Sequence, residues 1–271
     1  MKQGRLRRGT ADSYVTRFWE DPMFDVLREV AVRLDGLAAF PDVPTLDARL
    51  LAPLRADPDH AFEHVLELQP PTPGRRDTKR QPPKDLGTLY DVRITDARRI
   101  PTRERSWHDV MNAIVFAAFP GAKTALHARQ AAELSRHFAT SGKLPNARSR
   151  LQDALALFDE GGVVLFGDSA AVAGARPALL GGEGEALGAM VKERRLRAVV
   201  FGHAMLEHAI LEAPLPRGAP VLVEDDDAFG PELRRRLDRA LTRHVATLAG
   251  EPGPPALDLR LLFERTRAAQ L

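Results

Sequence analysis

Apolar residues recur every three to four positions in several stretches of the chain, which is the pattern of helices that bury one face. Between Asp21 and Leu37, for example, Phe24, Leu27 and Val30 follow this spacing, with a proline near the start and a glycine near the end. Polar residues able to cap a helix stand before two further stretches, at Ser106 and Asp168–Ser169. We predict helices over residues 21–37, after Ser106, over 121–139, 148–158, 169–180, 203–211 and 231–248.

Other segments alternate apolar and polar residues or carry short β-branched runs, as strands do. These segments are residues 60–68, 89–95, 163–166, 196–201 and 221–223. The glycine-rich stretch Gly181–Gly188 predicts a flexible break. Strands mixed irregularly among a larger number of helices predict an α+β (mixed α/β) fold, helix-rich with a small sheet.

The distribution of these patterns predicts one globular domain over residues 21–250, between a flexible arm over 1–20 and a tail over 251–271. Residues 69–83 hold five prolines and four basic residues, so we expect an exposed loop there. The 271 residues are enough for a sizeable core.

Composition excludes several classes of protein. There is no cysteine, which rules out disulfides, thiolate metal sites and cysteine nucleophiles. The 39 Lys and Arg nearly balance the 37 Asp and Glu, unlike a dedicated nucleic-acid module. No apolar run approaches the length of a membrane span, and no apolar segment follows the basic start. We therefore expect a cytoplasmic protein without a membrane partner.

The stretch from Ser106 to Lys123 carries the strongest candidate chemistry. On a helix, His108 and Asn112 lie one turn apart on the same face. His108 would serve as a general base or metal ligand, Asn112 would hold a substrate carbonyl, and Asp109 would complement the helix N-terminus. The alternative is structural, with His108 bonded to a backbone carbonyl.

Two further clusters carry imidazole and carboxylate groups. Asp153, Asp159 and Glu160 flank a predicted helix end, where acids oppose the helix dipole and therefore need a partner such as a metal or a basic side chain. His203 and Glu207 are one helical turn apart and would form half of a metal site. The alternatives are a plain turn for the first cluster and a hydrogen bond within the helix for the second.

Residues 72–105 are locally basic, so contact with phosphate or nucleic acid is conceivable there. Only Tyr90 supplies an aromatic ring for stacking in this region, and a solvated loop is the favoured interpretation. The chain has no phosphate-binding glycine loop, no dinucleotide fingerprint and no serine nucleophile elbow.

Three blocks that occur in this order carry a family resemblance: YDVRITDARRIPTRERSWHDVMNAIVFAAFPGAKTALHARQ, RSRLQDALALFDEGGVV and FGHAMLEHAI. Together they resemble the bacterial family catalogued as domain of unknown function 3025, over roughly residues 21–222. The most specific parts are Trp107–Ala113 and Phe119–Lys123. The chain departs from the expected pattern at His127, where an asparagine is expected, and over Gly181–Gly188. The resemblance implies no reaction, but it implies that the three polar blocks meet in space.

These observations lead to two functional hypotheses. The first is a metal- or acid/base-assisted, hydrolase-like enzyme with a His/Asp/Glu pocket, an unknown small-molecule ligand and one divalent metal as its candidate cofactor. Its catalytic candidates are His108, Asp109, Asn112, Lys123, Asp159 and Glu160, and its metal candidates are His203 and Glu207. The second is a non-catalytic binding or scaffold protein, for which nucleic acid or another acidic partner is conceivable but not favoured.

Overall fold

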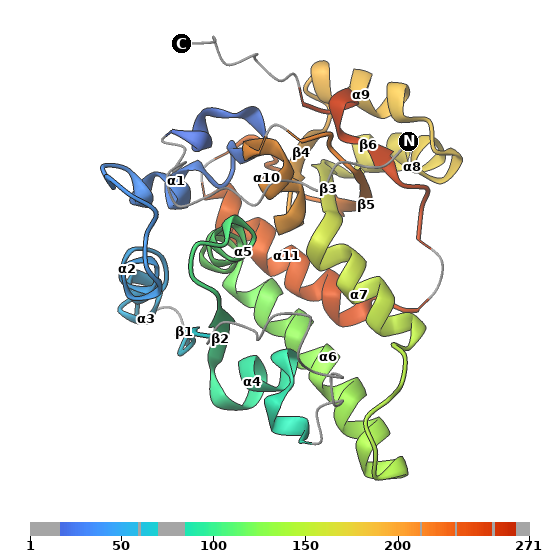
Figure 1. Cartoon of the computed structure of the whole chain (residues 1–271). Helices are drawn as coiled ribbons and strands as arrows, with labels where there is room; N and C mark the ends of the chain where they lie inside the picture. The colour runs from blue at the N-terminus through green and yellow to red at the C-terminus, as the bar shows by residue number, and fades with distance from the viewer. Residues whose placement is uncertain are drawn as a thin grey trace, which may run out of the picture.

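The chain folds into a helix-rich α+β structure in which helices greatly outnumber strands (Figure 1). The computed structural model describes residues 17–58, 61–69, 85–211, 213–230, 232–250 and 253–263. The first sixteen residues of the predicted arm and residues 70–83 of the predicted Pro/Arg loop lie outside the described residues. No helix within the described ranges combines the length and the apolar character needed to cross a membrane.

Residues 18–55 form a series of short helical pieces. The sequence predicts one helix over residues 21–37, but the structure divides this stretch into three short helices that follow one another. Asp21 caps the piece that begins at Pro22, with its side chain accepting a hydrogen bond from the Met23 amide. The pieces are η1 (Phe18–Glu20), η2 (Pro22–Phe24), α1 (Arg28–Ala31), η3 (Val32–Leu34), α2 (Val43–Leu46), η4 (Asp47–Leu51) and α3 (Ala52–Arg55).

Most of the longer predicted helices are present, with caps where the sequence placed them. The Ser106 and Asp168 side chains accept hydrogen bonds from the amides of Asp109 and Ala171 at the starts of α5 and α8. The helices are η5 (Leu86–Thr88), α4 (Tyr90–Ala97), α5 (Trp107–Ala118), α6 (Pro120–Ser141), α7 (Arg150–Gly161), α8 (Ser169–Gly181), α9 (Gly184–Lys192), α10 (His203–Ile210), α11 (Leu233–Thr247) and η6 (Leu259–Leu261).

Two predictions in this part were wrong. Residues 89–95, predicted as a strand, form most of α4, because packing of this segment against α6 and β2 overrides the strand-like alternation of Tyr90, Val92 and Ile94. The predicted break over Gly181–Gly188 is interrupted by α9, which begins soon after Gly182 turns the chain with a φ of 71°.

The strands form two small sheets. β1 (Val65–Leu68) pairs in parallel with β2 (Arg99–Thr102), so the predicted strand over residues 60–68 is confirmed only in its second half. The second sheet has the order β4-β3-β5-β6, in which β3 is antiparallel to β4 and parallel to β5. Its strands are β3 (Gly162–Gly167), β4 (Arg197–Val200), β5 (Arg217–Glu224) and β6 (Leu257–Asp258).

One cluster of buried apolar side chains runs from Phe18 to Phe263. Figure 1 shows α5, α6, α7 and α11 in the middle of the molecule, with the four-stranded sheet above them and α8 and α9 beyond it. Trp19, from the predicted arm, and Leu257 and Leu259, from the predicted tail, belong to this cluster. β3 is buried along its whole length, so the elements around it are fixed by the core.

Candidate functional site

Helix α5 carries the first part of the site and is almost entirely buried. Trp107, its first residue, packs edge-on against Phe18 and Phe40, at centroid distances of 5.7 and 5.0 Å. The Ser106 cap fixes where the helix begins. His108 therefore lies in the first turn of a rigid helix, with 29 % of its side chain exposed.

The second part of the site comes from the junction of α7 with β3 and of β4 with α10. Because β3 and β4 are antiparallel, the end of β4 lies beside the start of β3. The amides of Phe201 and Gly202 both donate to the Gly162 carbonyl at 2.9 Å. A side chain at Gly202 would lie 2.5 Å from Gly161 Cα, so only glycine allows this close approach. The junction places His203 next to the acids at the end of α7.

Three side chains from these elements converge on one point. The Nε2 atoms of His108 and His203 are 3.0 Å apart, and Oε2 of Glu160 is 3.6 Å from Nε2 of His203. One ligand atom from each of the three residues lies within 4.8 Å of the others. Nitrogen ligands about 2.0–2.1 Å from a tetrahedral zinc ion are roughly 3.3 Å apart, so the spacing suits such an ion. His203 is buried, whereas the Glu160 side chain is 52 % exposed. The group of three therefore reaches the solvent at Glu160.

A carboxylate lies on the Nδ1 side of each imidazole. Nδ1 of His108 is 3.1 Å from Oε2 of Glu207, and Nδ1 of His203 is 3.9 Å from Oδ2 of Asp159. The ammonium of Lys123, which has no exposed surface, forms an ion pair with Asp159. For His108, the hydrogen bond from Nδ1 to a carboxylate and the open Nε2 form the arrangement that orients histidine ligands in metal proteins, whereas Nδ1 of His203 has no hydrogen-bond partner.

The electrostatics differ between the two histidines. Burial lowers the pKa of His203 to about 3, so its ring is neutral near pH 7. Burial also acts to lower the pKa of His108, but the hydrogen bond with Glu207 and the charge of Glu160 outweigh it and raise that pKa. Burial works to raise the pKa of Asp159, yet the charge of Lys123 holds it well below the usual range.

The other predicted site residues lie around this group. Asp109 accepts three hydrogen bonds from Arg103, from its backbone amide, Nε and Nη2, at 2.6–2.9 Å. Asn112 donates from Nδ2 to the hydroxyl of Tyr90 at 2.8 Å. Asp153 lies in the first turn of α7, near the opposite end of that helix from Asp159 and Glu160. Glu207, predicted as a metal ligand, instead contacts Nδ1 of His108 and lies outside the group of three candidate ligands.

Sequence reasoning missed three residues of the surrounding network. Tyr90 and Asp91 begin α4, and Asp91 accepts a hydrogen bond from Nδ1 of His127 at 2.8 Å. The incorrect strand prediction over 89–95 concealed this contribution from a helix start. The spacing of Lys123 and His127, one turn apart on α6, was the available signal for His127.

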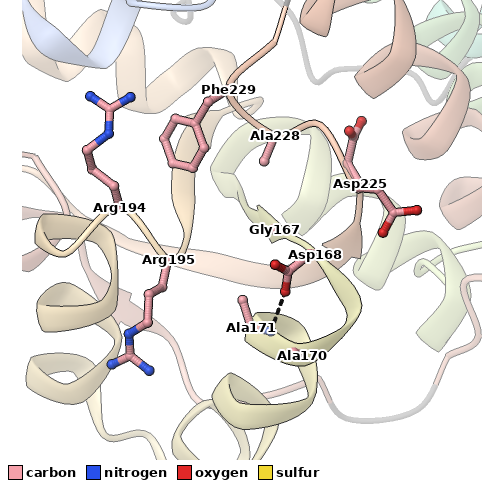
Figure 2. Close-up of a pocket in the computed structure, with 10 residues that line it drawn as sticks. Gly167, Asp168, Ala170, Ala171, Arg194, Arg195, Asp225, Ala228 and Phe229 are labelled. Atoms are coloured by element: carbon pink, nitrogen blue, oxygen red, sulfur yellow. Dashed lines mark hydrogen bonds between the residues drawn. The ribbon is translucent and has the colours of Figure 1, made fainter.

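A separate cavity of about 420 Å³ lies at the other end of β3. Figure 2 shows Asp168 hydrogen-bonded to Ala171 at the start of α8, with Arg194 and Arg195 on one side and Asp225 on the other. The guanidinium of Arg194 lies over the Phe229 ring, 4.8 Å from its centroid. None of the predicted site residues lines this cavity.

Comparisons with known proteins give a family but no activity. A search of the curated proteins and a search of the solved structures each found no match. The sequence model of one family matches residues 78–252, which is more than half of the chain and includes His108, Glu160 and His203. The chain therefore belongs to the family described as protein of unknown function (DUF3025).

Proposed function

We propose that this protein is a metal-dependent hydrolase whose divalent ion is held by His108, His203 and Glu160. The observation that carries the proposal is the convergence of both Nε2 atoms and the Glu160 carboxylate, with a carboxylate behind each imidazole. Two histidines and one glutamate are a ligand set of catalytic zinc sites, where a fourth position stays open for water or substrate.

The protonation pattern supports a cation between the rings. The hydrogen bond from His108 Nδ1 to Glu207 favours the tautomer in which Nδ1 carries the proton and Nε2 carries the lone pair, and the charge of Asp159, 3.9 Å from Nδ1 of His203, biases that ring the same way. Two lone pairs 3.0 Å apart repel each other unless a proton or a metal ion lies between them. His203 is neutral because it is buried, which keeps its nitrogen available as a ligand.

The charges of the site suit a dication. Glu160, Glu207 and Asp159 contribute three negative charges and Lys123 contributes one positive charge, which leaves a net charge of −2 with neutral histidines. A divalent ion would neutralise this charge in a partly buried place, where uncompensated charge is costly.

Each residue then has a distinct task. His108, His203 and Glu160 would hold the ion, which when bound supplies an activated water molecule near neutral pH. Glu207 would orient His108, while the Lys123–Asp159 pair would orient His203. The exposed side of Glu160 leaves the group open to solvent and therefore to a substrate.

The test is metal analysis of protein purified without a histidine tag. We expect about one equivalent of a divalent transition metal in the parent protein, and its loss in His203→Ala. His208→Ala is the matched control, because His208 lies on the same helix but bonds the Pro214 carbonyl at 2.9 Å.

A metal-free parent protein, or a His203→Ala variant that retains its metal, would overturn the proposal. The first of these results would favour the alternative of a non-catalytic binding or scaffold protein. Hydrolysis itself is tested by assaying ester and amide substrates before and after chelation, with the lost activity expected to return when zinc is added back.

A further inference from the structure

A second group of polar side chains lies directly behind the three candidate ligands. Asn112 follows His108 by one turn of α5, and its Nδ2 donates to the Tyr90 hydroxyl at 2.8 Å. The Tyr90 and His127 rings meet edge to face, 5.6 Å apart. The His127 ring in turn stacks on Phe116, the same ring that the Lys123 ammonium contacts at 4.7 Å. The group thus joins α4, α5 and α6 beside the Lys123–Asp159 pair.

Two acceptor atoms in this group have no hydrogen-bond partner. They are Oδ1 of Asn112 and Nε2 of His127, and their side chains are 6 % and 2 % exposed. Nδ1 of His127 faces the Asp91 carboxylate and donates to it, and in the neutral tautomer that this contact favours, Nε2 is an acceptor. A buried polar atom without a partner is costly, so two in one group point to a partner outside the chain.

The same group also offers a hydroxyl donor. The Tyr90 hydroxyl accepts from Asn112 and keeps its own hydrogen for another partner. Burial, followed by the negative charge of Asp159, raises the pKa of Tyr90 well above its usual value, so this hydrogen stays in place near neutral pH.

We propose that Tyr90, Asn112 and His127 form a subsite for a primary carboxamide group. The two unpartnered acceptors would take the two N–H groups of the amide, and the Tyr90 hydroxyl would donate to its carbonyl oxygen. The inference rests on the proposed function, because it names the substrate class for the neighbouring metal site. The reaction would be RCONH₂ + H₂O → RCOO⁻ + NH₄⁺, in which the C–N bond breaks, a C–O bond to the water oxygen forms and ammonia leaves with the protons.

This pattern of donor and acceptors discriminates among related groups. A carboxylate has no N–H and would face two lone pairs, while an N-methyl amide satisfies only one of the two acceptors. Leaving a buried polar atom unpaired is what makes polar sites selective. Tyr90, 37 % exposed, is the outermost of the three, so a small amide would enter as its ring turns aside.

The experiment uses the full chain loaded with zinc and the small probes acetamide, N-methylacetamide and acetate. Binding is followed by ligand-observed NMR titration and turnover by ammonia release. We expect acetamide to bind about tenfold more tightly than N-methylacetamide, as expected for one lost hydrogen bond, and acetate not to compete. Tyr90→Phe keeps the ring and should weaken acetamide binding about tenfold, with unchanged zinc content.

The outcomes separate this inference from the proposed function. If zinc is bound but acetamide binds no better than N-methylacetamide, or Tyr90→Phe has no effect, the amide subsite is wrong and the metal site stands. If the protein takes up no zinc, the proposed function fails, whereas the ranking of the probes in the metal-free protein still decides whether the amide is recognised.

Discussion

At the scale of single residues, the most demanding feature is the ion pair between Lys123 and Asp159. The ammonium of Lys123 is fully buried, and the Asp159 side chain is only 14 % exposed. Removing one partner of such a pair leaves an uncompensated charge in the interior, which is more damaging than removing both.

We therefore predict that Lys123→Met lowers the free energy of unfolding by about 3–5 kcal/mol. The double variant Lys123→Met/Asp159→Asn should recover much of this loss, because no buried charge remains unpaired. Urea unfolding of the parent, the single variant and the double variant measures both effects. If Lys123→Met lowers the free energy of unfolding by less than about 1 kcal/mol, as the loss of an exposed ion pair would, then Asp159 is solvated.

His64 gives a prediction about pH that is independent of the metal site. Its ring is 3 % exposed and lies near Phe62 and Phe116, and burial followed by the charge of Arg98 lowers its pKa to about 4. Between about pH 4 and 6.5 the unfolded chain holds a proton on this residue and the folded chain does not. Stability should therefore fall as the pH is lowered through this window.

His64→Phe keeps an aromatic ring and removes the titration. The stability difference between variant and parent should grow in favour of the variant as the pH falls from 6.5 to 4, by up to about 3 kcal/mol. His203 and His244 are present in both proteins, so their contributions cancel in the stability difference between variant and parent. Thermal unfolding at several pH values therefore isolates the contribution of His64. A constant difference across this range would contradict the assigned pKa.

At the scale of secondary structure, the site depends on how closely the start of α10 approaches the end of α7. Gly202 has an ordinary φ of −68°, so its importance is steric: an added Cβ would lie 2.5–2.6 Å from backbone atoms of Glu160, Gly161 and Gly162. Backbone atoms cannot move aside as a flexible side chain can.

We predict that Gly202→Ala separates His203 from Glu160 and lowers stability by about 1–3 kcal/mol, the usual cost of overpacking. Metal content should fall at the same time, because two of the three ligands border this junction. Gly174→Ala is the control: nothing lies within 4 Å of its added methyl group inside α8, so the change should stabilise by about 0.5–1 kcal/mol. A Gly202→Ala variant with normal stability and metal content would contradict this account of the junction.

The same junction shows what the sequence could and could not reveal about the site. Local signals, such as the Ser106 cap and the apolar spacing around His108, predicted the helix that carries this ligand. The pairing of Glu207 with His108 spans 99 residues and could not be read from the spacing of His203 and Glu207 on one helix. Likewise, the alternation from Tyr90 to Thr95 is a strand pattern, and the packing on α6 that makes this segment helical cannot be read from it.

At the scale of the whole molecule, the C-terminal segment closes the sheet on the side away from the candidate site. β6 pairs with β5 through Leu257 and Gly218, while β4, which leads into His203, lies at the other edge. Composition alone suggested a tail here, because the buried residues Leu257 and Leu259 follow a run of proline and glycine. The match to the family ends at residue 252, before this segment.

We predict that Leu259→Ala lowers the free energy of unfolding by about 2–5 kcal/mol, because the side chain is fully buried. The exposed Leu180, at 64 %, is the control, and Leu180→Ala should change stability by no more than about 0.5 kcal/mol. Since β6 and β4 occupy opposite edges of the sheet, folded Leu259→Ala protein should keep its full metal content. Chemical unfolding and metal analysis of both variants test this separation. Loss of metal from the folded Leu259→Ala variant would mean that the two edges of the sheet are coupled and that the candidate site depends on the C-terminal segment.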